Sequence, residues 1–249
     1  MTVVLVGSVL IYNSLRLGYR WQWYRVPRYL ADISDTGWEP GPLLRGAGIT
    51  IAISFFSLVL SSLFGLTAAL LKLSSSTIGT LLANLYIEAI RNTPLLIQLL
   101  FFYFVIAPIF GISPFASAVI ALSLFEGAYA SEIIRGGIVA IPKGQWEAAR
   151  SIGMSTWKTY RHVVLPQALR IMMPPLAGQA VSLIKDSALV SVIAIYDLTM
   201  QAQAIVSETF LTFEIWFVVA ILYLSMTLTL SYCVRYWEKR NNRFASFCS

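Results

Sequence analysis

Residues 49–71 read ITIAISFFSLVLSSLFGLTAALL, an apolar stretch that ends at Lys72. About 20 apolar residues in an α-helix cross a hydrocarbon layer roughly 30 Å thick, so this stretch predicts a transmembrane helix. The whole chain fits that prediction, because 57% of its 249 residues are hydrophobic and only 12% are charged. A soluble domain carries about 25% charged residues. The sequence therefore predicts a polytopic membrane protein.

Further apolar stretches flank the first one. Windows of about 19 residues predict five core spans, at 49–71, at 78–107 with an interruption at Pro94, at 115–139, at 168–195 and at 213–235. Another apolar segment at 2–17 runs into Arg16 and an aromatic stretch rather than into a cleavage site, so we interpret it as an uncleaved span. The predicted fold class is all-α, a membrane helical bundle of five core helices plus one extra N-terminal span.

Charged residues orient this bundle. The insert at 140–167 holds Lys143, Arg150, Lys158, Arg161 and His162 against one acid, Glu147. Basic loops accumulate in the cytoplasm, so we expect the insert there. The chain then divides into an N-terminal span with an amphipathic aromatic arm (1–48), a transmembrane domain (49–240) and a cytoplasmic tail (241–249). This orientation puts the arginines of 16–48 outside, against the general rule.

The composition excludes several kinds of chemistry. Two cysteines and the single His162 provide no ligand cluster for zinc and no basis for thiol redox chemistry. The sequence contains no GxxxxGK[ST] string, the loop that cradles nucleotide phosphates, so we do not expect this chain to hydrolyse ATP. The net charge of +6 is typical of basic cytoplasmic loops and does not indicate nucleic-acid binding.

The insert contains a distinctive motif. Glu147-Ala148-Ala149 is followed by Gly153, and VVLP follows at 163–166. This pattern predicts a short helix, a tight turn at the glycine and a second short helix that ends near Pro166. An apolar ridge of Met154, Trp157 and Tyr160 on a charged loop is typical of a docking site. A connector folded against its own bundle is the alternative.

These residues resemble the EAA-x3-G-x9-hydrophobic-x-LP signature of permease subunits in bacterial ABC importers. RNTPLLIQ at 91–98, GAYASEIIRGGI at 127–138, IPKGQWEAA at 141–149 and SLIKDS at 182–187 are similar to the polar amino acid permeases of the histidine/glutamine/arginine type. In that family the loop forms a coupling helix in a cleft of the ATPase. The resemblance thus implies coupling by Glu147, Ala148, Ala149, Gly153, Met154, Ser155, Trp157 and Pro166.

The same resemblance implies the partners of a membrane complex in the bacterial inner membrane. These are ABC ATPase subunits, a second permease subunit that is identical or paralogous, a periplasmic amino-acid-binding protein and the lipid bilayer. ATP and Mg would be bound by the ATPase, so no cofactor is expected on this chain.

Charged groups inside the spans are costly, about 2.5 to 3.5 kcal/mol each on insertion scales, so each needs a partner or a function. Glu126 or Asp186 could accept the ammonium group of an amino acid. The cavity candidates are Glu126, Asp186, Asn92, Gln98, Tyr129, Gln179, Ser182 and Lys185. The structural alternatives are an ion pair of Glu88 with Arg91, another of Glu132 with Arg135, and ties from Lys185 to Glu132 or Arg91.

Three functions remain open on these observations. The first is an importer permease that moves polar amino acids by alternating access, driven by a separate ATPase. The second is a self-sufficient ion- or proton-coupled carrier that uses Glu126 and Asp186 as relays, although such carriers usually show internal repeats and none is convincing here. The third is an anchor or sensor subunit, which would not need charged groups in several spans.

Overall fold

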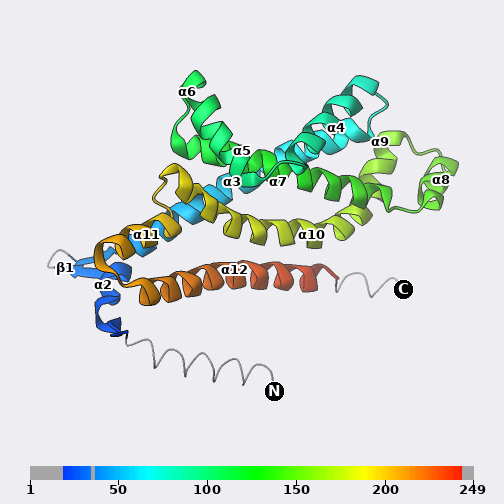
Figure 1. Cartoon of the computed structure of the whole chain (residues 1–249). Helices are drawn as coiled ribbons and strands as arrows, with labels where there is room; N and C mark the ends of the chain where they lie inside the picture. Colours follow the sequence, from blue (N-terminus) through cyan, green and yellow to red (C-terminus); the bar gives the residue numbers. More distant parts are fainter. Residues whose placement is uncertain (1–18, 35–36, 243–249) are drawn as a thin grey trace, which may run out of the picture.

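The computed structural model describes residues 19–34 and 37–242. The predicted span at 2–17 and most of the tail at 241–249 lie outside the described residues. Within them, four helices are long and apolar enough to cross a membrane. They are α3 (Pro42–Leu73), α7 (Pro114–Val139), α10 (Leu165–Asp186, continued by the 3-10 segment η4, Ser187–Ile193) and α12 (Thr212–Asn242). The helical bundle is confirmed, and Figure 1 shows these helices side by side.

The predicted span at 78–107 is a broken pair of helices. Helix α4 (Thr77–Arg91) is followed by helix α5 (Leu95–Phe101), and the stretch Leu95–Phe110 that begins with α5 is bent by 105° from α4. Pro94 excludes the preceding residue from helical geometry, which accounts for a break at this site. The chain continues through the π-helical segment η2 (Phe102–Ile106) and helix α6 (Ala107–Phe110). The interruption was predicted, but its size was not.

Small residues bring α3 and α7 together. Ser57, Ser61, Gly65 and Ala69 recur every four residues along α3 and are buried. Ser123, Gly127 and Ser131 do the same along α7. Residues four apart share one face of a helix, and small side chains at that spacing allow membrane helices to approach closely. The interface between α3 and α7 therefore depends on short side chains.

We expect the substitution Gly65→Leu to separate these two helices. A Cβ on Gly65 would lie 2.8 Å from the Cβ of Ala130, which is closer than side chains can approach. Overpacking of this kind costs about 1 to 3 kcal/mol. The melting temperature of the detergent-solubilised protein should fall. The variant Gly48→Leu is the control, because a Cβ at that position of α3 meets nothing within 4 Å; equal melting temperatures would contradict the packing role.

A further helix lies between the predicted spans at 168–195 and 213–235. Helix α11 (Leu198–Thr209) begins at Asp197, whose Oδ1 accepts a hydrogen bond of 2.9 Å from the Met200 amide. The hydroxyl of Tyr223 donates to Oδ2 across 3.4 Å. Burial raises the pKa of Asp197 to about 6, and the hydrogen bonds that it accepts oppose this shift because they stabilise the ionised carboxylate.

We expect Asp197→Ala to destabilise the packing of α11 against α3 and α12. The variant loses an N-cap and leaves the Tyr223 hydroxyl without this acceptor, at a combined cost of about 2 kcal/mol. The variant Asp197→Asn keeps an oxygen at the capping position and should melt close to the wild type. A melting temperature of Asp197→Ala that matches that of Asp197→Asn would exclude the capping role.

The aromatic arm folds into short elements rather than one amphipathic segment. It contains the 3-10 turn η1 (Trp23–Arg25), helix α2 (Pro27–Leu30), and the antiparallel strands β1 (Ala31–Ser34) and β2 (Gly37–Pro40). The hairpin pairs Ala31 with Pro40. It leads directly into α3, which begins at Pro42 rather than at the predicted residue 49.

Candidate functional site

The first half of the insert is a helix that ends at a glycine. Helix α8 (Lys143–Ser151) ends in a Schellman motif. The Gly153 amide donates to the Arg150 carbonyl at 2.9 Å, and the Met154 amide donates to the Ala149 carbonyl at 3.1 Å. This closure requires a left-handed residue, and Gly153 has φ +76°. The predicted tight turn at Gly153 is confirmed.

The second half of the insert is continuous with the bundle. Helix α9 (Thr156–Thr159) is capped by Ser155, whose hydroxyl accepts from the Lys158 amide. A π-helical segment, η3 (Tyr160–Val164), then runs straight into α10. The prediction that a short helix stops near Pro166 is wrong, because this proline sits in the first turn of α10, where its missing amide is tolerated.

The apolar ridge of the insert differs from the predicted one. Trp157 is 69% exposed, and Ile152, which the sequence pattern did not single out, is 77% exposed. Tyr160 turns inward and packs edge-on against Trp146 with ring centroids 5.0 Å apart. Met154 is half-buried. The exposed apolar surface of the insert is therefore formed by Ile152 and Trp157.

The insert packs against two membrane helices. Val164, Ala168 and Met172 from η3 and α10 form one buried cluster with Ile134 and Ile138 of α7. Trp146 and Tyr160 pack against the same cluster. Ala149 is also buried, whereas Ala148 remains exposed on the outer side of α8. Through Trp146, α8 is thus packed against the cluster that joins α7 to α10. Figure 1 shows α8 and α9 at one end of the bundle, opposite the hairpin.

A second group of candidates lies inside the bundle. Glu126 of α7 is 4% exposed and interacts with Asp186 at the end of α10. Its Oε2 has no hydrogen-bond partner among the described residues, and neither has Oε1 of Gln179 or Oε1 of Gln98. Buried oxygens without donors are costly. Among the predicted cavity residues, Glu126, Asp186 and Gln179 thus offer acceptors for a positively charged group. Ser182 lies on α10 between the last two and is partly exposed.

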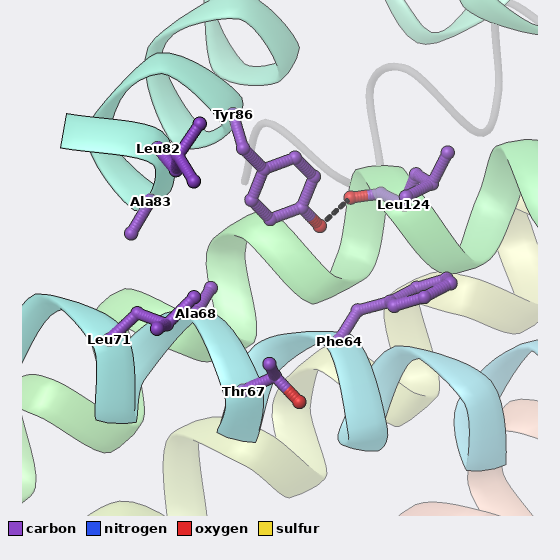
Figure 2. A pocket seen from close by; sticks show the side chains of 8 residues that line it. All are labelled: Phe64, Thr67, Ala68, Leu71, Leu82, Ala83, Tyr86 and Leu124. Carbon is purple, nitrogen blue, oxygen red and sulfur yellow. Dashed lines mark hydrogen bonds between the residues drawn. The ribbon is translucent and has the colours of Figure 1, made fainter. Parts of the chain in front are cut away.

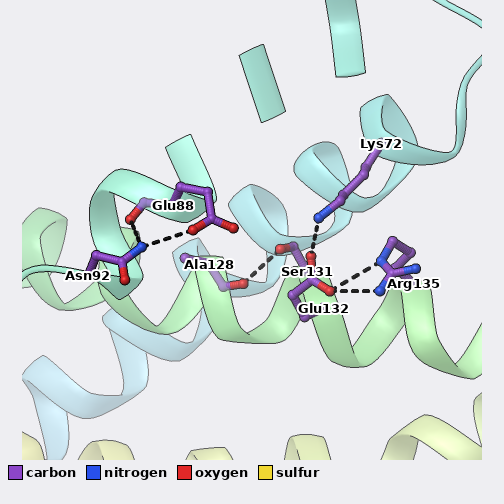
Figure 3. Close-up of polar contacts among 7 residues, drawn as sticks. All are labelled: Lys72, Glu88, Asn92, Ala128, Ser131, Glu132 and Arg135. Atoms are coloured by element: carbon purple, nitrogen blue, oxygen red, sulfur yellow. Dashed lines mark hydrogen bonds and ion pairs between the residues drawn. The ribbon is translucent and has the colours of Figure 1, made fainter. Parts of the chain in front are cut away.

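Other cavity candidates have structural partners. The Gln98 amide nitrogen donates to the carbonyl of Ile90 at 2.7 Å and to the hydroxyl of Thr93 at 2.7 Å, so it bridges the break between α4 and α5. Asn92 donates to the Glu88 carboxylate at 2.9 Å (Figure 3). Gln98 therefore holds the broken helix pair together, whereas Asn92 caps the end of α4.

The predicted Glu88–Arg91 ion pair is not formed. Among the described residues, the acid is bound by Asn92, and the Arg91 guanidinium lies 5.2 Å from the centre of the Tyr129 ring. Side chains three residues apart on a helix lie near one another, but the Arg91 side chain lies over the Tyr129 ring of α7 instead. Tyr129 also packs against Phe125.

The predicted Glu132–Arg135 ion pair is confirmed and gains a third member. Glu132 accepts from Arg135 at 2.9 Å and from Lys72 of α3 at 2.6 Å, as Figure 3 shows. Both basic groups neutralise one acid, so Glu132 is not available to Lys185. Lys185 is exposed and lies beside Asp186. The expected tie from Lys185 to Glu132 or Arg91 is therefore wrong within the described chain.

A small apolar pocket lies between α3, α4 and α7. It has a volume of about 210 Å³ and is lined by Phe64, Thr67, Ala68, Leu71, Leu82, Ala83, Tyr86 and Leu124 (Figure 2). Its two hydroxyls are satisfied, because Tyr86 donates to the Leu124 carbonyl at 2.6 Å and Thr67 to the Leu63 carbonyl at 2.8 Å. Without a free polar group this pocket does not suit a zwitterionic ligand.

Comparison with known proteins relates this arrangement to transport systems. The chain is 41% identical over 207 residues to the glutamine transport system permease protein GlnP of Escherichia coli (strain K12), covering 82% of this chain and 94% of that protein. It is 46% identical over 168 residues to the L-cystine transport system permease protein TcyB of Bacillus subtilis (strain 168), covering 66% of this chain and 71% of that protein.

Solved structures agree with these relatives. A crystal structure of an amino acid ABC transporter with histidines matches with a TM-score of 0.75 and 42% identity, over 80% of this chain and 94% of that one. The family described as binding-protein-dependent transport system inner membrane component matches residues 61–243. The chain therefore belongs to this family of multi-pass inner-membrane permease subunits.

Proposed function

We propose that this chain forms half of the membrane pathway of an ABC importer for polar amino acids, and that a separate ATPase subunit drives it through the insert at 140–167. The observation that carries the proposal is the exposed surface of Ile152 and Trp157 on a loop that is rigidly packed against α7 and α10. An apolar surface of this kind on a charged loop suits a protein partner.

The transported class is inferred from the interior of the bundle. A polar amino acid carries an ammonium group, and the Glu126–Asp186 pair supplies acceptor oxygens for it, of which Oε2 of Glu126 is buried without a donor. Oε1 of Gln179, on the same helix as Asp186, is also buried without a donor. The relatives named for glutamine and cystine transport and the transporter crystallised with histidines favour the same class. The Ser182 hydroxyl, on the same helix as Gln179, would contribute a donor for the carboxylate.

Alternating access supplies the mechanism. When the ATPase subunits close on ATP and Mg, they would displace α8. Because α8 packs on the cluster that joins α7 to α10, the carboxyl pair at the interface of those helices would change its access from one side of the membrane to the other. A second permease subunit would cover the exposed polar groups at membrane depth, among them Lys185 and Arg91.

Reconstituted vesicles test the proposal. The chain is inserted with its cognate ATPase, and the extracytoplasmic binding protein is added outside with radiolabelled amino acid. Uptake should require internal ATP and the added binding protein. Uptake driven by an ion or proton gradient without ATP would overturn the proposal in favour of a self-sufficient carrier.

A further inference from the structure

At the end of the bundle opposite α8, the N-terminal arm presents aromatic side chains beside the start of α12. Trp21, Trp23 and Tyr24 are 43%, 46% and 80% exposed. The rings of Trp21 and Trp23 stack with centroids 5.9 Å apart and 5° between their planes. Together with the exposed Arg20 and Arg28, these three aromatic residues are called the arm face below.

Helix α12 fixes the position of the arm face. Glu214 of α12 is completely buried, and its two carboxylate oxygens accept from the Tyr19 hydroxyl at 2.5 Å and from the Gln22 amide at 2.6 Å. The Tyr19 ring also packs against Phe213 at 4.8 Å. Because Tyr19 and Gln22 lie on either side of Trp21 in the sequence, these contacts fix the position of Trp21 along the axis of α12. This position is called its height below.

That height corresponds to the membrane interface. The apolar part of α12 begins at Thr212, and both tryptophans contact Phe217, with centroid distances of 6.5 and 6.3 Å. Phe217 lies five residues after Thr212, a distance of about 7.5 Å along the helix. This distance is similar to the thickness of one interfacial layer of a bilayer, about 5 to 8 Å. Tryptophan and tyrosine are enriched at this level because one edge of each ring is apolar and the other is polar.

The charges of the arm face are all basic. Among the described residues, neither Arg20 nor Arg28 forms an ion pair, and Arg28 instead contacts the ring and hydroxyl of Tyr29. Arg45, close by in sequence, differs because Glu39 binds it at 3.1 Å. Guanidinium groups at the level of the headgroups match the geometry of phosphate oxygens.

We propose that the arm face binds the phosphate headgroup of an anionic phospholipid in the leaflet opposite the insert. Arg20 and Arg28 contact the phosphate, and the stacked tryptophans lie against the glycerol and upper acyl chain. This assignment also accounts for arginines on the side of the membrane where the general orientation rule does not expect them, because lipid phosphate supplies their counter-charge.

Lipid selectivity tests the proposal. The intact complex is placed in nanodiscs of phosphatidylcholine with a minor fraction of phosphatidylglycerol, extracted, and the retained lipids are counted by mass spectrometry. Each basic residue near the headgroups strengthens binding of anionic lipid by about fivefold. The double variant R20Q/R28Q should therefore lose most of the preference for phosphatidylglycerol, and R20K/R28K should keep it. R45Q is the matched control and should behave as the wild type.

Two results would overturn the proposal. One is equal phosphatidylglycerol retention by the wild type, R20Q/R28Q and R20K/R28K. The other is weaker binding of the extracytoplasmic binding protein by R20Q/R28Q in nanodiscs of pure phosphatidylcholine, because the arginines would then contact an acidic protein surface. Both readouts are independent of which solute the complex transports, so they stand apart from the proposed function.

Discussion

Gly153→Val is expected to reduce ATP-driven uptake tenfold or more while the associated ATPase continues to hydrolyse ATP. The glycine has φ +76° and closes α8 through two backbone hydrogen bonds. A β-branched residue in this conformation costs about 1 to 3 kcal/mol, and 1.4 kcal/mol corresponds to a factor of ten in population. The turn would open, and the exposed surface of Ile152 and Trp157 would lose its fixed relation to α7.

A graded series of variants at Gly153 distinguishes backbone strain from steric crowding as the cause of the lost uptake. A Cβ on Gly153 meets no atom within 4 Å, so bulk alone is harmless to the chain itself. Asparagine tolerates the left-handed region and alanine does so less well. Uptake should therefore decrease in the order Gly153→Asn, Gly153→Ala, Gly153→Val. The measurement is the ratio of solute imported to ATP hydrolysed in vesicles, together with co-purification of the ATPase.

Unchanged uptake by Gly153→Val would exclude the turn as a coupling element. A uniform loss across all three variants, with the ATPase no longer co-purifying, would instead show that the partner contacts Gly153 directly. The positional control is Gly144→Val on the same helix, where the backbone has no unusual φ and a Cβ is also unobstructed. Its uptake should stay close to that of the wild type.

The sequence predicted the turn at Gly153 and four of the spans, at 49–71, 115–139, 168–195 and 213–235, because their signals are local. A left-handed glycine after a helix and an uncharged apolar stretch each depend on neighbouring residues only. The interior of the bundle depends on contacts between distant segments. Lys72 and Glu132 lie 60 positions apart and still form the 2.6 Å contact that removes Glu132 from the reach of Lys185.

Helix α11 was not predicted from the sequence, for a related reason. Its 12 residues are too few for a span, and its helical pattern is masked by polar residues. The residue before its first turn, Asp197, is of a type that favours the N-cap position, which is a signal of a helix start. The small residues spaced by four on α3 and α7 also predict a close helix contact, and that periodicity was readable from the sequence.

Glu126→Gln is expected to weaken transport of cationic amino acids about 10- to 100-fold and that of neutral ones much less. The carboxylate has a buried Oε2 without a donor, at the contact with Asp186. A hydrogen bond to a charged group contributes about 1.5 to 3 kcal/mol, which converts to that range of affinity. A second positive charge on the substrate depends most on the acidic pair, whereas the amide of the variant retains the shape of the side chain.

A double-variant cycle shows whether the two acids act as one site. Groups that act together give effects that are not additive, so E126Q/D186N should transport cationic substrate about as poorly as either single variant. The matched control is Glu88→Gln, since that carboxylate is exposed and bound by Asn92. Equal losses for cationic and neutral substrates in Glu126→Gln would assign the pair to packing of α7 against α10. Additive losses would mean that Glu126 and Asp186 contact the substrate at separate points, which requires a wider cavity than one that holds a single ammonium group between them.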